Sequence, residues 1–214
     1  QIRSRIRYEM RSYPNFAAPS GADPADLALA LRFPRAFNPR AQGLAREWRD
    51  SSGDNAAIVR RAVEFFRGSR FEYTLTPPLL GAHSVDEFLF DTQQGFCEHF
   101  ASSFVFLMRA AGVPSRIVTG YLGGELNTFN DTWVVRQSDA HAWAEVWIAE
   151  RGWVRVDPTG AVAPERIEGG LEEALPDGEV LPGDYLRSFD LLINLRDGWD
   201  AMDTAWNRFF LGYG

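Results

Sequence analysis

The segment from residue 97 to residue 156 constrains the fold most, because it places one helical pattern directly before a series of strand patterns. From Cys97 the apolar side chains recur at spacings of three and four residues, and Gly112-Val113-Pro114 ends this pattern. Four runs rich in Val, Ile, Trp and Tyr follow, at residues 115–122, 132–137, 141–149 and 153–156. A helix that is followed by strands predicts an α+β fold, in which the helix packs on an antiparallel sheet.

The residues before this segment predict scaffold elements. Alternating arginines indicate an edge strand over residues 2–10, and apolar spacing predicts helices over 40–49 and 56–68. A short strand at 71–75, a short helix at 85–91 and a loop at 92–96 follow. We therefore expect residues 1–165 to form one domain, with an N-terminal strand and scaffold helices in 1–92 and the core that carries the chemistry in 93–159.

The C-terminal part has a different composition. Residues 158–182 contain four prolines among Gly and Glu, which favours an extended, partly disordered connection. From Tyr185 to Tyr213 large apolar side chains step by three or four residues, which predicts a long amphipathic helix. We therefore expect residues 166–214 to hold a Pro/Gly-rich connection and a long C-terminal helix.

Charge and composition exclude several functions. The chain has 22 basic and 29 acidic side chains, a net charge of −7 and no basic cluster, so we expect no nucleic-acid partner. The longest uncharged apolar stretch, residues 100–108, is too short to span a membrane. Because the chain starts at Gln1 without an initiator Met, we expect it to be part of a longer protein.

The only cysteine is Cys97, which excludes an intrachain disulfide and a metal site built from several cysteines. A thiol nucleophile needs an imidazole that accepts and returns a proton, and a group that orients this imidazole. His141 and Asp157 follow Cys97 in that order. On the first turn of its helix, Cys97 would meet free backbone N–H groups and the positive end of the helix dipole, which favour the thiolate.

The spacing of His141 and Asp157 predicts that the two meet across a hairpin. Exact pairing needs a turn centred on residue 149, whereas Arg151-Gly152 favours a later turn, so a bulge or a diagonal contact is the alternative. Gln93, Gln94 and Trp143 are candidates for the oxyanion site or the substrate channel. Four tryptophans lie within 21 positions, and most are expected in the core of the sheet (Trp133, Trp143, Trp147 and Trp153).

Other interpretations of these residues remain open. A free cysteine on an amphipathic helix is often a small buried apolar residue, and Asp157 before Pro158 is typical of a turn. His99 competes as the base, although residues two apart on a helix do not face each other. His83 lies in a Gly-Ala-His-Ser segment that is typical of a surface loop.

Four ordered blocks of this sequence resemble the transglutaminase-like core family. They are GFCEHFA at 95–101, RAAGVPSR at 109–116, HAWAEVW at 141–147 and GWVRVDPT at 152–159. The resemblance implies a papain-like α+β fold and a catalytic triad of Cys97, His141 and Asp157. Residues 199–213 resemble the segment before the last membrane helix of bacterial membrane-anchored transglutaminases, which implies a periplasmic domain of an inner-membrane protein, anchored by flanking segments.

The family implies protein-glutamine acyl transfer. Cys97 would attack a glutamine side-chain amide to form a thioester, and a primary amine or water would then take the acyl group. The partners would be a glutamine-bearing donor and an amine-bearing acceptor, and we favour a monomer. No EF-hand pattern is present, and we expect no metal and no cofactor. A cysteine peptidase or amidase, or a scaffold domain without catalysis, is the alternative function.

Overall fold

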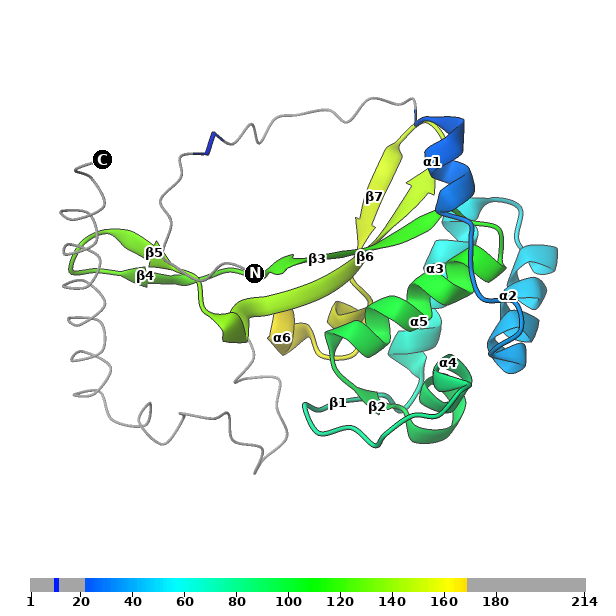
Figure 1. Ribbon diagram of the computed structural model, residues 1–214, viewed down its shortest axis with the longest axis horizontal. Coiled ribbons are helices and arrows are strands. Elements are labelled where there is room, and N and C mark those ends of the chain that lie inside the picture. The colour runs from blue at the N-terminus through cyan, green and yellow to red at the C-terminus, as the bar shows by residue number, and fades with distance from the viewer. Residues whose placement is uncertain (1–9, 12–21, 169–214) are drawn as a thin grey trace. The chain divides into compact units, whose positions relative to one another are not determined.

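The computed structural model describes residues 10–11 and 22–168, and Figure 1 shows the order of their helices and strands. These residues belong to two compact units. Residues 124–135 belong to one unit, and residues 22–123 and 136–168 belong to the other, which we call the core unit. The core unit contains all three predicted catalytic residues, so the description of the site concerns it alone.

Three helices open the core unit: α1 (Pro24–Leu29), α2 (Pro39–Ser51) and α3 (Asn55–Gly68). The last two confirm the helices predicted at 40–49 and 56–68. The α3 helix begins where the Asp54 side chain accepts a hydrogen bond from the Ala57 N–H at 2.7 Å. The first N–H groups of α2 are capped by a residue more than 40 positions later in the sequence. The buried Asp86 carboxylate accepts hydrogen bonds from the N–H groups of Arg40 and Ala41.

The segment before Cys97 is more ordered than the sequence suggested. The short helix predicted at 85–91 is present as α4 (Ser84–Glu87), which continues into one π-helical turn, η1 (Phe88–Thr92). The prediction of a plain loop at 92–96 is wrong, because β2 (Gln94–Gly95) pairs in parallel with β1 (Glu72–Tyr73). Two residues are too few to show a period, which is why the pattern hid this strand.

The central helix α5 (Cys97–Ala110) begins at Cys97, as predicted, and it is buried on almost every side. It contacts α2 on one side and strand β6 (Ala140–Ile148) on the other. The apolar core around it is rich in aromatic rings from α3, η1 and α5 itself (Phe66, Phe88, Phe100 and Phe104). This packing holds the first turn of α5, and with it Cys97, in one place.

The sheet of the core unit has three antiparallel strands in the order β3 (Ser115–Tyr121), β6, β7 (Gly152–Val156). Ala142, Ala144 and Val146 alternate along β6 and are buried, and Figure 1 shows α5 against this sheet. The predicted arrangement of a helix on an antiparallel sheet is confirmed. The strands expected at 115–122, 141–149 and 153–156 form this sheet.

The fourth predicted strand, at 132–137, is only partly correct. Strand β5 (Thr132–Val134) pairs with β4 (Glu125–Asn127) in a separate hairpin and does not join the main sheet. Gln137 instead starts a 3₁₀ turn, η2 (Gln137–Asp139). Between the two strands, Asp131 takes a positive φ of 51° and the Asn130 side chain accepts the N–H of Thr132, so local turn chemistry closes this hairpin.

The chain after β7 corrects a further expectation. Residues 158–168 are not an extended connection, because they form a 3₁₀ turn, η3 (Pro158–Ala161), and a helix, α6 (Pro164–Glu168), which crosses the domain boundary expected after residue 165. The predicted edge strand at 2–10, except for its last residue, and the helix from Tyr185 lie outside the described residues. No helix within the described residues is long and apolar enough to cross a membrane.

Candidate active site

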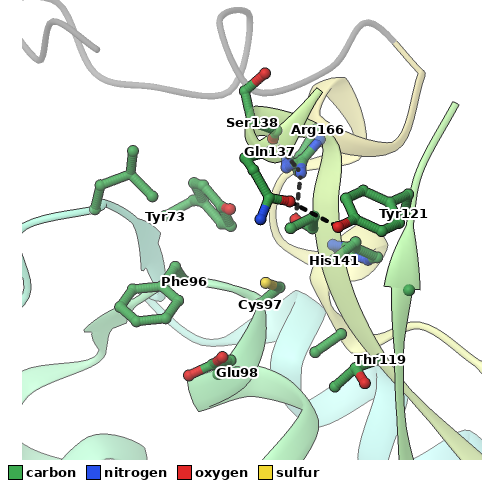
Figure 2. A pocket seen from close by; sticks show the side chains of 14 residues that line it. Tyr73, Phe96, Cys97, Glu98, Thr119, Tyr121, Gln137, Ser138, His141 and Arg166 are labelled. Carbon is green, nitrogen blue, oxygen red and sulfur yellow. Dashed lines mark hydrogen bonds between the residues drawn. The ribbon is translucent and has the colours of Figure 1, made fainter. Parts of the chain in front are cut away.

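Cys97 is the first residue of α5 and is buried, with 7% of its surface exposed. It lines a pocket of about 510 Å³ together with residues of β1, β3, β6 and α6. Figure 2 shows Cys97 and His141 at this pocket, with the sulfur of Cys97 turned into it. The helix start supplies N–H groups that lack a partner within the helix, which suits the binding of a negatively charged oxygen.

The histidine that shares this pocket is held by Asp157. His141 Nε2 donates to Asp157 Oδ2 over 2.8 Å, and no part of the His141 side chain is exposed to solvent. The β6–β7 register pairs Ala144 with Val156 and Ile148 with Gly152, so the turn is centred on residue 150. His141 and Asp157 are therefore diagonal neighbours on one face of the sheet, which confirms the diagonal alternative.

The other ring nitrogen of His141 is left for the thiol. Nδ1 is buried and has no hydrogen-bond partner of good geometry among the described residues. Burial lowers the pKa of His141, but the hydrogen bonds and charges of Asp157 and Cys97 outweigh it, so the pKa lies above 6.5. Because Nε2 is taken by Asp157, Nδ1 is the ring nitrogen that remains for a partner in the pocket.

The Asp157 carboxylate is held on three sides. Its Oδ2 also accepts from Arg155 Nη2 at 3.3 Å, and its Oδ1 accepts from the Thr159 N–H at 3.2 Å. Burial raises the pKa of Asp157, but His141 and Arg155 outweigh burial and keep the pKa below 3.8. Asp157 is therefore ionised at neutral pH, and its charge stabilises a positive charge on His141.

The other two histidines, including the competing base His99, make different contacts. His99 lines a different pocket, and its ring contacts Phe88 and Phe96. Its Nδ1 accepts a hydrogen bond from the Phe96 N–H at 3.4 Å. Burial lowers the pKa of His99. His83 is exposed, as expected, and its Nδ1 accepts from the Asn38 N–H at the start of α2. Neither histidine lines the pocket of Cys97.

The candidates for the oxyanion site and the substrate channel lie in different places. The side chain of Gln93 donates to the Leu89 carbonyl, that of Gln94 donates to Glu72, and neither residue lines the pocket. Trp143 does not line the pocket either, and its ring stacks beside that of His141, with centroids 6.2 Å apart. A Cβ on Gly120 would lie 2.9 Å from this ring, so Gly120 gives Trp143 its space.

The four clustered tryptophans are less buried than expected. Trp133 is 68% exposed, in the hairpin, and the other three are half-buried. Arg116 covers the ring of Trp153, and Arg155 covers that of Trp143. The rings of Trp143 and Trp153 thus lie under arginine side chains, whereas Ala142, Ala144 and Val146 of β6 are buried.

The sequence analysis missed two buried polar residues of the pocket, Tyr73 and Arg166. Both are buried, with 5% and 1% of their surfaces exposed. Arg166 Nη2 donates to the carbonyls of Ser138 and Ala140, which immediately precede His141. Neither residue lies in a matched sequence block, and only the FEYTL run at 71–75 offered a signal, as a strand.

Fold and site together define a class of protein: α+β proteins with a thiol at a helix start and a histidine–aspartate pair on an adjoining antiparallel sheet. In the described part of the chain, no group of three or more His, Cys, Asp or Glu side chains could hold a metal ion. A model of the transglutaminase-like superfamily matches residues 42–158, more than half of the chain. The chain belongs to the transglutaminase-like superfamily.

Two relatives in Pseudomonas aeruginosa and Bacillus subtilis show how far the similarity extends. A protein-glutamine gamma-glutamyltransferase of P. aeruginosa is 44% identical over 218 residues, which cover 99% of this chain and 33% of that protein. The uncharacterized protein YebA of B. subtilis is 40% identical over 114 residues, which cover 50% of this chain and 16% of YebA. The chain thus spans about a third or less of the length of these relatives.

A solved structure supports the fold. The crystal structure of the periplasmic domain of TgpA from P. aeruginosa superposes with a TM-score of 0.72 and 50% sequence identity. The match covers 74% of this chain and 55% of that one. A second crystal structure of the same domain, bound to ethylmercury, gives a TM-score of 0.69.

Proposed function

We propose that this chain is the catalytic part of a protein-glutamine transglutaminase with Cys97 as nucleophile, His141 as acid and base, and Asp157 as the group that orients His141. The observation that carries the proposal is the 2.8 Å bond between His141 and Asp157, which leaves the buried Nδ1 of His141 for the Cys97 thiol. The relative that matches almost the whole chain is a protein-glutamine gamma-glutamyltransferase, and this supports the same reaction.

The first half of the reaction forms a thioester. His141 Nδ1 takes the thiol proton, and the Cys97 sulfur attacks the carbon of a glutamine side-chain amide. The charge of Asp157 stabilises the imidazolium that forms, because Nε2 keeps donating to Oδ2. The imidazolium then returns the proton to the leaving nitrogen, and ammonia departs as the carbon–nitrogen bond breaks.

The second half releases the acyl group. A primary amine attacks the thioester, His141 removes one of its protons, and the carbon–sulfur bond breaks to restore the thiolate. Water in place of the amine gives deamidation. The donor is thus a glutamine-bearing protein or peptide, and the acceptor is an amine of a protein, a peptide or cell-wall peptide. We place the domain in the periplasm, attached to the inner membrane by flanking segments, in line with the periplasmic domain that it resembles.

The deciding experiment incubates the 214-residue chain with a glutamine-rich protein and a fluorescent primary amine. We expect covalent labelling of the protein and release of ammonia, and we expect Cys97→Ala and His141→Ala to lose both. His83→Ala is the matched control, because this exposed histidine lies outside the pocket, and it should keep its activity.

Three outcomes would contradict the proposal. Hydrolysis of peptide bonds without amine incorporation would identify a peptidase. Labelling that persists in folded Cys97→Ala would mean that the thiol is not the nucleophile. A folded chain without any thiol-dependent turnover would favour a scaffold domain.

A further inference from the structure

Tyr73 is held beside the first turn of α5 by contacts that fix its ring. Its backbone lies in β1, where Tyr73 pairs with Gly95, two residues before Cys97. Its ring is parallel to that of Phe100 on α5, with 7° between the planes and 6.4 Å between the centroids. Figure 2 shows the hydroxyl of Tyr73 turned into the pocket, toward Cys97 and Arg166.

The hydrogen-bond partners of this hydroxyl leave its proton available. Burial raises the pKa of Tyr73 above 10.0, as does the charge of Cys97, while hydrogen bonds with the Arg166 side chain and the Cys97 backbone lower it in part. A guanidinium and a backbone N–H can only donate, so both bonds end on the hydroxyl oxygen. No hydrogen bond from the hydroxyl to another described residue is present. The Tyr73 proton can therefore be donated to a ligand in the pocket.

Arg166 makes this hydroxyl a stronger donor. Its side chain is almost fully buried, and it forms no ion pair with any carboxylate of the described residues. Its contacts with the carbonyls of Ser138 and Ala140 fix the guanidinium between the start of β6 and the Tyr73 hydroxyl. A cation beside a phenol oxygen draws electrons from the O–H bond, and the low exposure of the site strengthens this effect.

We propose that the Tyr73 hydroxyl and the Cys97 backbone N–H together form the oxyanion hole of this enzyme, and that Arg166 is the positioning residue that orients and polarises Tyr73. The inference rests on the proposed acyl transfer at Cys97 and goes further, because it assigns the oxyanion donor to β1 and not to Gln93 or Gln94. Tyr73 and Cys97 both line the pocket, and Cys97 is the first residue of α5.

The role follows from the electron movements at the carbonyl. When the Cys97 sulfur forms its bond to the amide carbon, the π electrons of the carbonyl move onto its oxygen. This oxygen then accepts one hydrogen bond from the Cys97 N–H and a second from the hydroxyl of Tyr73. When the carbonyl forms again, the same electrons return and the carbon–nitrogen bond breaks, so Tyr73 donates throughout and transfers no proton.

The test is Tyr73→Phe, which keeps the ring beside Phe100 and removes only the hydroxyl. We expect kcat for amine incorporation to fall about 10²- to 10³-fold, the usual effect of losing one oxyanion donor, while KM changes little. Tyr121→Phe is the matched control. It removes a hydroxyl at the exposed edge of the same pocket, and this hydroxyl donates to Gln137. Its effect on kcat should be at least tenfold smaller.

A second measurement separates oxyanion binding from other roles of Tyr73. Alkylation of Cys97 by iodoacetamide occurs at a saturated carbon and creates no oxyanion, so its rate should be the same in Tyr73→Phe and in the unchanged chain. A parallel fall in alkylation and in kcat would mean that Tyr73 acts on the thiolate, and this would overturn the inference. An unchanged kcat in Tyr73→Phe would overturn it as well, and would leave a structural role.

The role of Arg166 is tested by a double-mutant cycle. Arg166→Lys alone should lower kcat, but when combined with Tyr73→Phe it should add little to the loss, because Arg166 acts through the Tyr73 hydroxyl. Additive losses would contradict this role. Failure of the proposed function is distinguishable, because the unchanged chain would then incorporate no amine, whereas failure of this inference alone leaves an active enzyme that does not need the Tyr73 hydroxyl.

Discussion

Replacement of Asp157 by asparagine tests how the carboxylate supports His141. The amide can lie in two orientations. In the first orientation the amide oxygen lies at the Oδ2 position and accepts hydrogen bonds from His141 and Arg155, and only the Thr159 N–H faces the NH₂ group. In the reverse orientation the oxygen accepts one hydrogen bond, and two N–H donors face the NH₂ group. We therefore expect the first orientation, which keeps the proton on Nε2 of His141 and leaves Nδ1 free for the thiol.

The magnitude follows from the loss of charge. A hydrogen bond to a charged group contributes about 1.5–3 kcal/mol and a neutral one about 0.5–1.5 kcal/mol, so the imidazolium loses about 1–1.5 kcal/mol of stabilisation. This corresponds to a fall in kcat of about 5- to 13-fold. Asp157→Ala removes the bond completely, and kcat should then fall about 10- to 150-fold.

The assay is steady-state incorporation of a fluorescent amine, with Asp50→Asn as the matched control on the exposed face of α2. The expected order of kcat is the unchanged chain, then Asp157→Asn, then Asp157→Ala. A loss of 10³-fold or more in Asp157→Asn would show that the amide points its NH₂ group at His141. An unchanged kcat would show that Asp157 does not act on His141. Either result would refute the reasoning.

Three further predictions follow from the site, the sequence and the packing. Because the pKa of His141 is raised above 6.5 and that of Asp157 is lowered below 3.8, their pair stabilises the fold most between about pH 4 and pH 6.5. The contribution of this pair to stability should fall as the pH rises through the pKa of folded His141 or drops through that of folded Asp157. The measurement is the difference in unfolding free energy between the unchanged chain and Asp157→Asn, and a difference that keeps growing toward pH 9 would contradict this expectation. The chain has five glutamines but no lysine, so the tag-free protein should stay monomeric on a denaturing gel until a lysine-bearing protein is added; multimers joined away from the N-terminus would contradict this. Gly95→Ala should lower the unfolding free energy by about 1–3 kcal/mol in urea titrations, because its Cβ would lie 2.7 Å from His99 Cβ. The control is Gly68→Ala, which has open space around its Cβ and lacks this clash. Equal stability of the two variants would show that the segment around Gly95 adapts.

Local patterns predicted the elements that carry the candidate triad. The helix that starts at Cys97 follows from apolar spacing and its Gly-Val-Pro end, and β6 and β7 follow from their Val, Ile and Trp content. The diagonal relation of His141 and Asp157 was open, because a hairpin register depends on where the turn is centred. The observed turn, with Glu150 at a φ of 67°, decided it.

Shorter or non-local features were not predictable in this way. β1 and β2 have two residues each, so neither shows a period, and their parallel pairing joins segments 22 positions apart. The strand at 132–134 has the composition of a sheet strand, but its partner is β4, and composition does not choose between partners. The buried carboxylate of Asp86 binds the start of α2 across 45 positions, and no local signal marks it as a cap.

The sequence by itself determined that Cys97 stands at a helix start, that His141 lies on a strand and that Asp157 directly follows the next strand, because periodicity and turn residues act within a few positions along the chain. Only the tertiary structure decided which groups surround the thiol. Tyr73 and Arg166 come from β1 and α6, far apart in the sequence, and packing around α5 brings them to one pocket. Such contacts depend on the shape of the whole core, since a polar side chain becomes part of a site only when the elements that carry it pack together.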